Sequence, residues 1–327
     1  IGYGARGVDS QLCLNRVDNM KEIQKEKING IVSLFMDSLR ELLKNDPLRM
    51  AGATAFFTTF ALPPILVILI QVFRLIVDPQ MVRVELFKSL SDIVGPEAVR
   101  QLVDVLSAFR GLAANWYITL AGFIFLLFIA TTLFKVIRSS INQIWKIRVM
   151  QKQGVIKSLR ARFQSIMVIL VAGVLFMLGI VAETIRVFIG DYISEYSPEL
   201  SFYFNSTLRY VLSIVVVTLW FWIVFLYLPD GKPEWSVAFA GALLTGILFS
   251  IGKIALHWLL SYSNINSVYG TSASIVLLLL FVFYSALILY YGAAFTKTWG
   301  LYKKTPIKPR RHAMHYRIIE SGIDEES

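Results

Sequence analysis

Long apolar runs alternate along the chain with shorter polar and basic segments. Five uncharged runs, each close to the ~20 residues that cross a bilayer as a helix, follow one another between Arg49 and Lys253. A sixth run, between Lys253 and Lys297, is too long for one span, and its Ser263-Asn264 centre is typical of a loop. The pattern predicts six membrane-spanning helices, over about residues 48–75, 113–135, 163–188, 207–228, 235–260 and 271–296.

Three further segments have apolar residues at helical spacing but are too polar to cross a membrane. Residues 20–45 predict an amphipathic helix in the cytoplasmic interface, and residues 77–112 predict two short amphipathic helices on the outer face. The expected fold is therefore all-α, a polytopic six-transmembrane-helix bundle with amphipathic interfacial helices. Its domains are a cytoplasmic N-terminal segment (1–46), the transmembrane domain (47–298) and a cytoplasmic tail, basic and then acidic (299–327).

Composition and charge fix the protein class and its orientation. A chain that is 56% hydrophobic and 17% charged, with a mean hydropathy of +0.62, is too apolar for a soluble globule of this size. Residues 135–162 hold eight Lys and Arg and no Asp or Glu, and such loops stay on the cytoplasmic side. Both termini are then cytoplasmic. The net charge of +10 reflects this asymmetry, so nucleic acid is not an expected partner.

Two features of the predicted spans indicate either packing or function. Pro63 and Pro64 lie near the middle of the first span, where proline removes backbone hydrogen bonds and should kink or break the helix. This site is either a packing kink or a discontinuous helix that lines a cavity. In the fifth span, small residues recur four apart and give one smooth face suited to close helix packing. These residues are Ala238, Ala242, Gly246 and Ser250.

Four ionisable residues near or within the spans are candidates for substrate or lipid binding. Lys253 and His257 lie four residues apart in the outer half of the fifth span. They either reach outward to the interface or form an anionic-headgroup or proton site that faces the bundle interior. Glu183 and Arg186 end the third span one helical turn apart, a spacing typical of an interfacial anchor.

The sequence offers little for metal binding or covalent chemistry. Cys13 is the only cysteine, and two of the three histidines, His312 and His315, lie in a tail that we expect to be mobile and to supply no third ligand. We also find no paired carboxylates on a cytoplasmic face and no nucleophile with a base. No metal, no cofactor and no enzymatic activity are therefore expected.

Several short motifs, in order along the chain, resemble the YihY/BrkB family of bacterial inner-membrane proteins, once labelled ribonuclease BN. The resemblance covers about residues 30–300. Its motifs are Ala51-Gly52-Ala53-Thr54-Ala55-Phe56-Phe57 leading to Leu62-Pro63, then Ser140-Ile141-Asn142-Gln143-Ile144-Trp145, Leu228-Pro229, Gly241-Ala242, Val268-Tyr269-Gly270 and Gly292-Ala293. From these we take Asn142, Trp145, Tyr269 and Gly270 as family-motif site residues. Two positions depart from the family pattern: this chain has Phe60 where the family often has Ser, and Ala294 where the family commonly has an acidic residue.

The resemblance implies six helices, cytoplasmic termini, and a role in envelope integrity or in moving lipids and other amphiphiles. Nothing in the residues supports the ribonuclease label. We therefore expect a transporter or flippase of an anionic lipid or other amphipathic substrate in the bacterial cytoplasmic membrane. The alternative is a non-transporting subunit or scaffold of a larger envelope complex. Expected partners are membrane lipids, anionic ones among them, and either further copies of the chain or a larger membrane protein complex.

Overall fold

Five long helices make up most of the described structure. The computed structural model describes residues 30, 32–73, 116–150, 198–262 and 273–316, with isolated positions between 84 and 103 and between 171 and 193. The helices are α2 (Pro47–Phe73), α5 (Trp116–Ile144), α7 (Pro198–Tyr227), α8 (Trp235–Tyr262) and α10 (Ala273–Tyr302). Each has 27 to 30 residues, about 40–45 Å at 1.5 Å per residue, which exceeds the ~30 Å hydrocarbon core of a bilayer.

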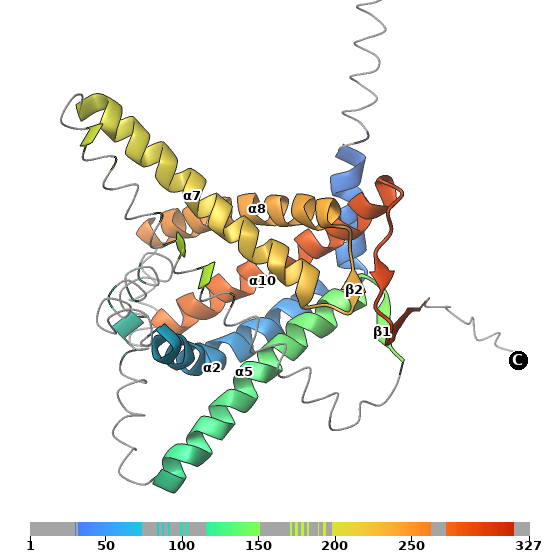
Figure 1. The fold of residues 1–327 in the computed structure, drawn as a ribbon, viewed down its shortest axis with the longest axis horizontal. Coiled ribbons are helices and arrows are strands. Elements are labelled where there is room, and N and C mark those ends of the chain that lie inside the picture. The colour runs from blue at the N-terminus through green and yellow to red at the C-terminus, as the bar shows by residue number, and fades with distance from the viewer. Residues whose placement is uncertain are drawn as a thin grey trace, which may run out of the picture.

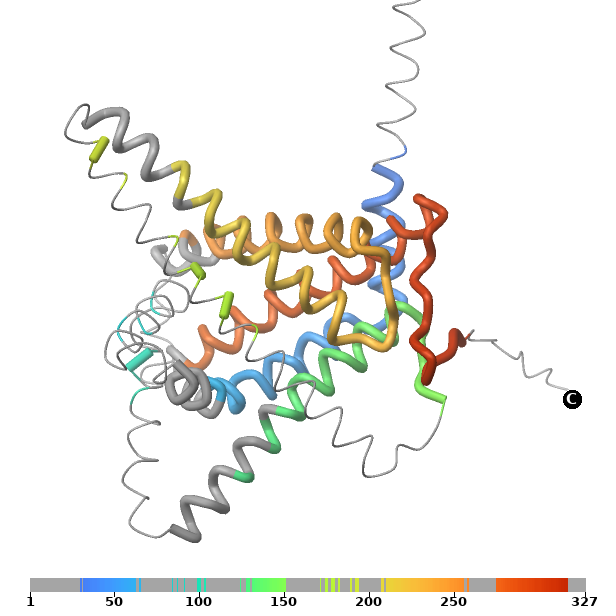
Figure 2. Tube along the Cα trace, in the orientation of Figure 1, coloured from blue at the N-terminus to red at the C-terminus, as the bar shows by residue number. Residues whose placement is uncertain are grey.

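The helices pack as neighbours in the order α5, α2, α10, α8, α7 (Figures 1 and 2). In this order α10 lies in the middle, against α2 on one side and α8 on the other. The largest buried cluster draws on all five helices and includes Phe225, Ile141 and Tyr290. By length and composition, three segments of the described residues are able to cross a membrane: Tyr210–Tyr227, Trp235–Ala255 and Ile275–Tyr302.

Most predicted spans correspond to a helix, with shifted ends. The first, second, fourth, fifth and sixth spans fall on α2, α5, α7, α8 and α10. α5 continues into the predicted basic loop as far as Ile144, and α10 continues past the sixth span to Tyr302. The third predicted span, 163–188, lies outside the described residues except for isolated helical positions. The count of six spans therefore stays a prediction.

α2 runs without interruption through Pro63 and Pro64. The expectation of a discontinuous helix there is wrong, and the alternative of a packing kink stays a prediction. Proline's fixed φ is compatible with a helix, and neighbouring helices and hydroxyl side chains compensate for the lost backbone bonds in membrane helices.

Two small β-ribbons join the helix ends at one end of the bundle. β1 (Ile147–Val149) pairs antiparallel with β4 (Ala313–His315), and β2 (Gly231–Lys232) pairs antiparallel with β3 (Lys308–Pro309). These strands bring together the chain after α5, the α7–α8 connection and the chain after α10. The predicted all-α fold did not include these strands. The tail was also expected to be mobile, which is wrong as far as Tyr316, because β3 and β4 hold it against the bundle. Strands of two or three residues are too short for an alternating pattern to reveal.

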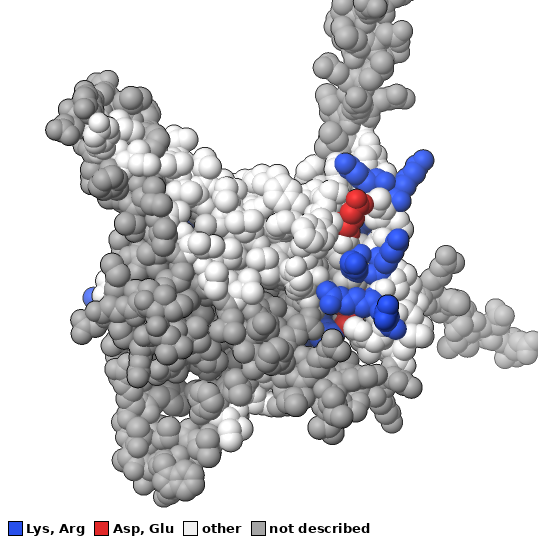
Figure 3. Space-filling view, in the orientation of Figure 1, with Lys and Arg blue, Asp and Glu red and all other residues white. Residues whose placement is uncertain are grey.

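Lys and Arg side chains gather at this same end (Figure 3). We call it the basic end; it comprises β1 to β4, the first residues of α2 and α8, and the last residues of α5, α7 and α10. The helix over residues 32–43 also lies there, crossing the direction of the bundle (Figure 1). The described N-terminal and C-terminal segments are thus on one side, as the charge pattern predicts.

The helix over residues 32–43 has three distinct faces. Its buried face (Leu34, Ser38, Leu42) packs on the bundle, and Ser38 Oγ lies 2.5 Å from Thr298 Oγ1 of α10. A second face is apolar and exposed, and a third is charged. The apolar exposed residues are Val32, Phe35, Met36, Leu39 and Leu43. Separate apolar and charged faces are typical of a helix in a membrane interface.

Candidate functional site

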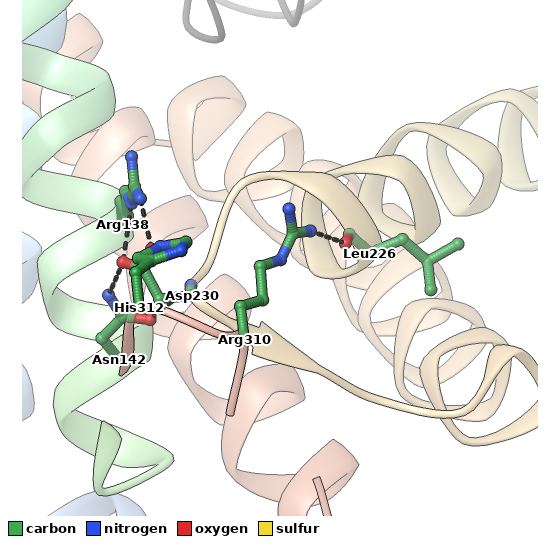
Figure 4. A network of polar contacts seen from close by, with 6 residues as sticks. All are labelled: Arg138, Asn142, Leu226, Asp230, Arg310 and His312. Atoms are coloured by element: carbon green, nitrogen blue, oxygen red, sulfur yellow. Dashed lines mark hydrogen bonds and ion pairs between the residues drawn. The ribbon is translucent and has the colours of Figure 1, made fainter. Parts of the chain in front are cut away.

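Asp230, directly after α7, is the centre of a polar cluster at the basic end (Figure 4). Its Oδ2 accepts hydrogen bonds from Arg138 Nε at 2.8 Å and Asn142 Nδ2 at 2.7 Å. Its Oδ1 accepts from Arg138 Nη2 and lies 2.7 Å from His312 Nε2. Its backbone N–H donates to Asn142 Oδ1 at 2.8 Å, and its carbonyl accepts from the Arg310 N–H at 2.9 Å. We call these five residues the Asp230 cluster.

The local sequence explains why Asp230 is held inside. The Pro229-Asp230-Gly231 turn connects α7 to α8, and the Asp230 side chain is only 1% exposed. Gly231 lies against Trp145, where an added Cβ would be 2.6 Å from ring atom Cε3. Only glycine permits this approach, so the turn packs flat on the end of α5.

Charge and burial act against each other in the Asp230 cluster. Burial alone would raise the pKa of the Asp230 carboxyl, but Arg138, His312 and Asn142 outweigh it and lower the pKa to about 2. Burial lowers the pKa of Arg310, whose Nη2 donates to the Leu226 carbonyl at 2.8 Å. Arg310 Nε is buried without a hydrogen-bond partner in the part of the chain that the structure describes. The cluster thus joins α5, the α7–α8 turn and the segment after α10.

A second polar group joins the helix over 32–43 to the bundle. Lys297 Nζ lies 2.7 Å from Glu41 Oε1 and 2.9 Å from the Ile144 carbonyl. Lys146 donates to Asn45 Oδ1 at 3.0 Å, and burial lowers the pKa of its amine. The buried Trp145 indole N–H donates to the Ala293 carbonyl at 2.9 Å. These contacts make the basic end a single cross-linked layer.

α8 and α10 cross at a reciprocal pair of glycines and threonines. A Cβ on Gly241 would overlap Thr296 Oγ1, and a Cβ on Gly292 would overlap Thr245 Oγ1. Each threonine donates to the carbonyl of the glycine four residues earlier on its own helix, at 2.6 and 2.7 Å. Small residues let the two backbones approach closely. The predicted smooth face of the fifth span is a different one, and its Gly246 packs on Thr218 of α7.

Lys253 lies on the inward side of α8. At about 100° per residue it shares a face with Ala242, Gly246 and Phe249, which are buried or partly buried. Gly246 and Phe249 face α7, and the Phe249 ring lies 6.0 Å from the Phe221 ring. The outward stripe of α8 is instead apolar and exposed, and Lys253 is half-buried. The stripe consists of Phe239, Leu243, Ile247, Ile251, Ile254 and Trp258.

The other predicted site residues divide into two groups. Asn142 and Trp145 lie together at the basic end, where each bonds a different neighbour. Glu183, Arg186, Tyr269 and Gly270 lie outside the described residues, and His257 belongs to α8 with its side chain undescribed. Within the described residues, no group of three His, Cys, Asp or Glu could hold a metal ion.

Sequence reasoning missed Asp230, Arg138 and His312 as one cluster. In the sequence, Arg138 is one of the eight cations of residues 135–162, His312 belongs to the tail that is expected to be mobile, and Asp230 lies in a Pro-Asp-Gly turn. The one available signal was an acid directly after an apolar span, next to a proline. Nothing in the sequence links position 230 to positions 138 and 312.

Residues 38–316 match the model of the family described as Virulence factor BrkB. The chain belongs to this family. Four of the motifs that carried the resemblance meet in the structure: Trp145 bonds the carbonyl of Ala293, Asn142 bonds the residue after Leu228-Pro229, and Gly241 lies against Gly292 and Thr296 of α10. BrkB motifs that are far apart in the sequence therefore lie together in one region, which comprises the basic end and the adjoining α8–α10 crossing.

Relatives of this BrkB-family chain are membrane proteins by name. The UPF0761 membrane protein of Delftia acidovorans is 26% identical over 270 residues, which are 79% of this chain and 60% of that protein. The one of Chlorobium chlorochromatii is 26% identical over 308 residues, 91% of this chain and 66% of that protein. The chain spans about 60–66% of the length of these two relatives. No solved structure matches.

Proposed function

We propose that this BrkB-family membrane protein moves an anionic lipid or other anionic amphiphile across the bacterial cytoplasmic membrane, with its basic end in the cytoplasm. Through this activity it contributes to envelope integrity. The work is translocation and involves no covalent chemistry. Loops rich in Lys and Arg are retained in the cytoplasm, which supports this orientation.

The observation that carries the proposal is the position of Lys253 on the inward face of α8. An ionisable side chain inside an apolar span is costly, and such residues usually mark a substrate or ion path. Lys253 is half-buried beside small and aromatic residues, and no acidic partner for it lies among the described residues. An anionic headgroup would supply the missing counter-charge.

The test is lipid transfer in liposomes that contain the purified chain and a fluorescent phosphatidylglycerol. Lys253→Ala should slow transfer roughly ten- to a hundredfold, because it removes one charge-assisted hydrogen bond worth roughly 1.5–3 kcal/mol. Lys253→Arg keeps the charge and should retain part of the rate. Lys303→Ala, an exposed lysine at the basic end, is the matched control and should transfer at the wild-type rate. Unchanged transfer by Lys253→Ala would remove this residue from the mechanism.

The second candidate function is a non-transporting subunit of a larger envelope complex. The exposed apolar face of the helix over 32–43 favours it, since a protein partner could cover Val32, Met36 and Leu39. Native mass spectrometry on protein extracted gently from its own membrane separates the two functions. A fixed mass increment from another polypeptide, with no selective lipid, would support the subunit. Selective adducts of one lipid class would support transport.

A further inference from the structure

Tyr284 of α10 has a buried hydroxyl that meets no partner at good hydrogen-bond geometry among the residues described in the structure. Its neighbour Ser285 donates instead to the Phe281 carbonyl, at 2.7 Å. A buried hydroxyl without a partner costs roughly 1–3 kcal/mol, so it calls for an explanation. A bound group that accepts its hydrogen bond is one.

The helix crossing places Tyr284 at the level of Lys253. Gly241 faces Thr296, Thr245 faces Gly292, and Gly252 faces Tyr284, so α8 and α10 run antiparallel in a constant register. A Cβ on Gly252 would lie 2.8 Å from Tyr284 Cε2, which means that the tyrosine ring packs directly on the α8 backbone beside Lys253. Glycine is the residue that makes room for this ring.

An aromatic cluster lies next to these two residues, with Phe249 on the side toward the basic end and Phe281 on the side away from it. The Phe249 ring, one turn before Lys253 on the same face, contacts the Phe281 ring edge-on at 6.0 Å. The Phe281 ring contacts the Tyr284 ring edge-on at 5.3 Å. The surroundings are apolar, which strengthens any hydrogen bond or ion pair formed there.

We propose that Lys253 and Tyr284 together bind the phosphate of an anionic headgroup beside the α8–α10 contact, on the side of α8 that faces α7, the amine giving charge and the hydroxyl a directed hydrogen bond. This inference rests on the proposed function and adds the ligand chemistry and a second binding residue. A phosphate oxygen accepts from both groups, whereas the tyrosine hydroxyl discriminates against lipids that lack such an acceptor.

Tyr284→Phe tests the hydroxyl alone. Native mass spectrometry of the full chain in detergent gives the affinity for phosphatidylglycerol and for diacylglycerol with the same acyl chains. We expect Tyr284→Phe to weaken phosphatidylglycerol binding about tenfold and to leave diacylglycerol binding unchanged. Its thermal unfolding midpoint should stay equal or rise, because no described hydrogen bond is lost. A midpoint that falls with unchanged lipid affinity would overturn the inference.

Tyr290→Phe is the matched control on the same helix. The Tyr290 hydroxyl lies 2.5 Å from Thr54 Oγ1, so this variant should lower the unfolding midpoint and leave phosphatidylglycerol affinity unchanged. Lys253→Ala separates the two proposals. Loss of affinity in Lys253→Ala but not in Tyr284→Phe overturns the inference alone, while loss in neither overturns the proposed function too.

Competition with inorganic phosphate shows whether the natural ligand of this site is a lipid headgroup or a soluble phosphate. If free phosphate at millimolar concentration displaces phosphatidylglycerol, and does so only with Lys253 and Tyr284 intact, the site takes a soluble anion. If phosphate leaves the lipid bound, the acyl chains are part of recognition and the ligand is a lipid. Both results support an anion site at these two residues.

Discussion

Asp230 joins three segments of the chain through a single carboxylate. Its two oxygens face four donor atoms, from Arg138, Asn142 and His312, which is the full capacity of a carboxylate. Because the side chain is 1% exposed, water cannot replace a lost partner. A charge this well paired stabilises the fold only while every partner remains in place.

Asp230→Asn should reduce the free energy of unfolding near neutral pH by about 3 kcal/mol, because it leaves Arg138 without its counter-charge. The folded pKa of Asp230, about 2, lies below the ordinary value of 3.8. Its contribution to stability is therefore complete above about pH 4 and is lost as pH falls toward 2. At 1.36 kcal/mol per pKa unit, the wild type should lose about 2 kcal/mol from this group over that range.

Thermal unfolding in detergent at pH 7, 4 and 2.5 measures this effect as the difference between wild type and Asp230→Asn. That difference should shrink at the lowest pH, since protonation removes the same charge that the substitution removes. Glu234→Gln, an exposed acid four residues later, is the control and should match the wild type throughout. A constant difference at all three pH values would contradict the assigned pKa.

At the scale of elements, the α8–α10 crossing depends on glycine at two positions. Gly241→Ala should lower the free energy of unfolding by about 1–3 kcal/mol, because its Cβ meets Thr296 Oγ1 and, at 3.0 Å, Thr296 Cβ. Thr296 cannot simply turn away, since its hydroxyl donates to the Gly292 carbonyl. Thermal unfolding of the purified variant measures the loss.

Gly52→Ala in α2 is the control for this substitution. An added Cβ there meets nothing within 4 Å, and alanine favours helix by roughly 0.5–1 kcal/mol, so this variant should be as stable as the wild type or more so. Adding Thr296→Ala to Gly241→Ala should restore part of the lost stability. A Gly241→Ala variant as stable as Gly52→Ala would show that the helices need not approach this closely.

Sequence patterns predicted where the helices lie far better than they predicted which residues of different helices contact one another. Uncharged runs located five helices because a bilayer imposes about 20 apolar residues on each span, a constraint local to the chain. The spacing of Ala238, Ala242 and Gly246 likewise predicted a packing face. By contrast, the partners of Asp230 lie 82 to 92 positions away in sequence, and such pairings depend on tertiary packing. The helical course of Pro63 and Pro64 also depends on neighbours that a local rule does not include.

At the scale of the whole molecule, the described segments that link the helices at the basic end all contact one another there. The turn after α5, the α7–α8 turn, the segment after α10 and the helix over 32–43 meet there through β1 to β4 and the Lys297–Glu41 ion pair. The loops of this end are thus folded against one another. The charged residues of the basic end therefore also stabilise this end of the bundle.

The proposed orientation can be tested with single cysteines in a Cys13→Ser background. Lys308→Cys lies exposed at the basic end, and Thr207→Cys lies exposed near the start of α7, at the opposite end. A membrane-impermeant maleimide should label Thr207→Cys in intact cells and Lys308→Cys only in inverted vesicles, because Lys- and Arg-rich loops stay in the cytoplasm. Permeabilised cells, in which both should react, control for accessibility. Labelling of Lys308→Cys in intact cells would reverse the proposed orientation and place Lys253 in the half of its span nearer the cytoplasm.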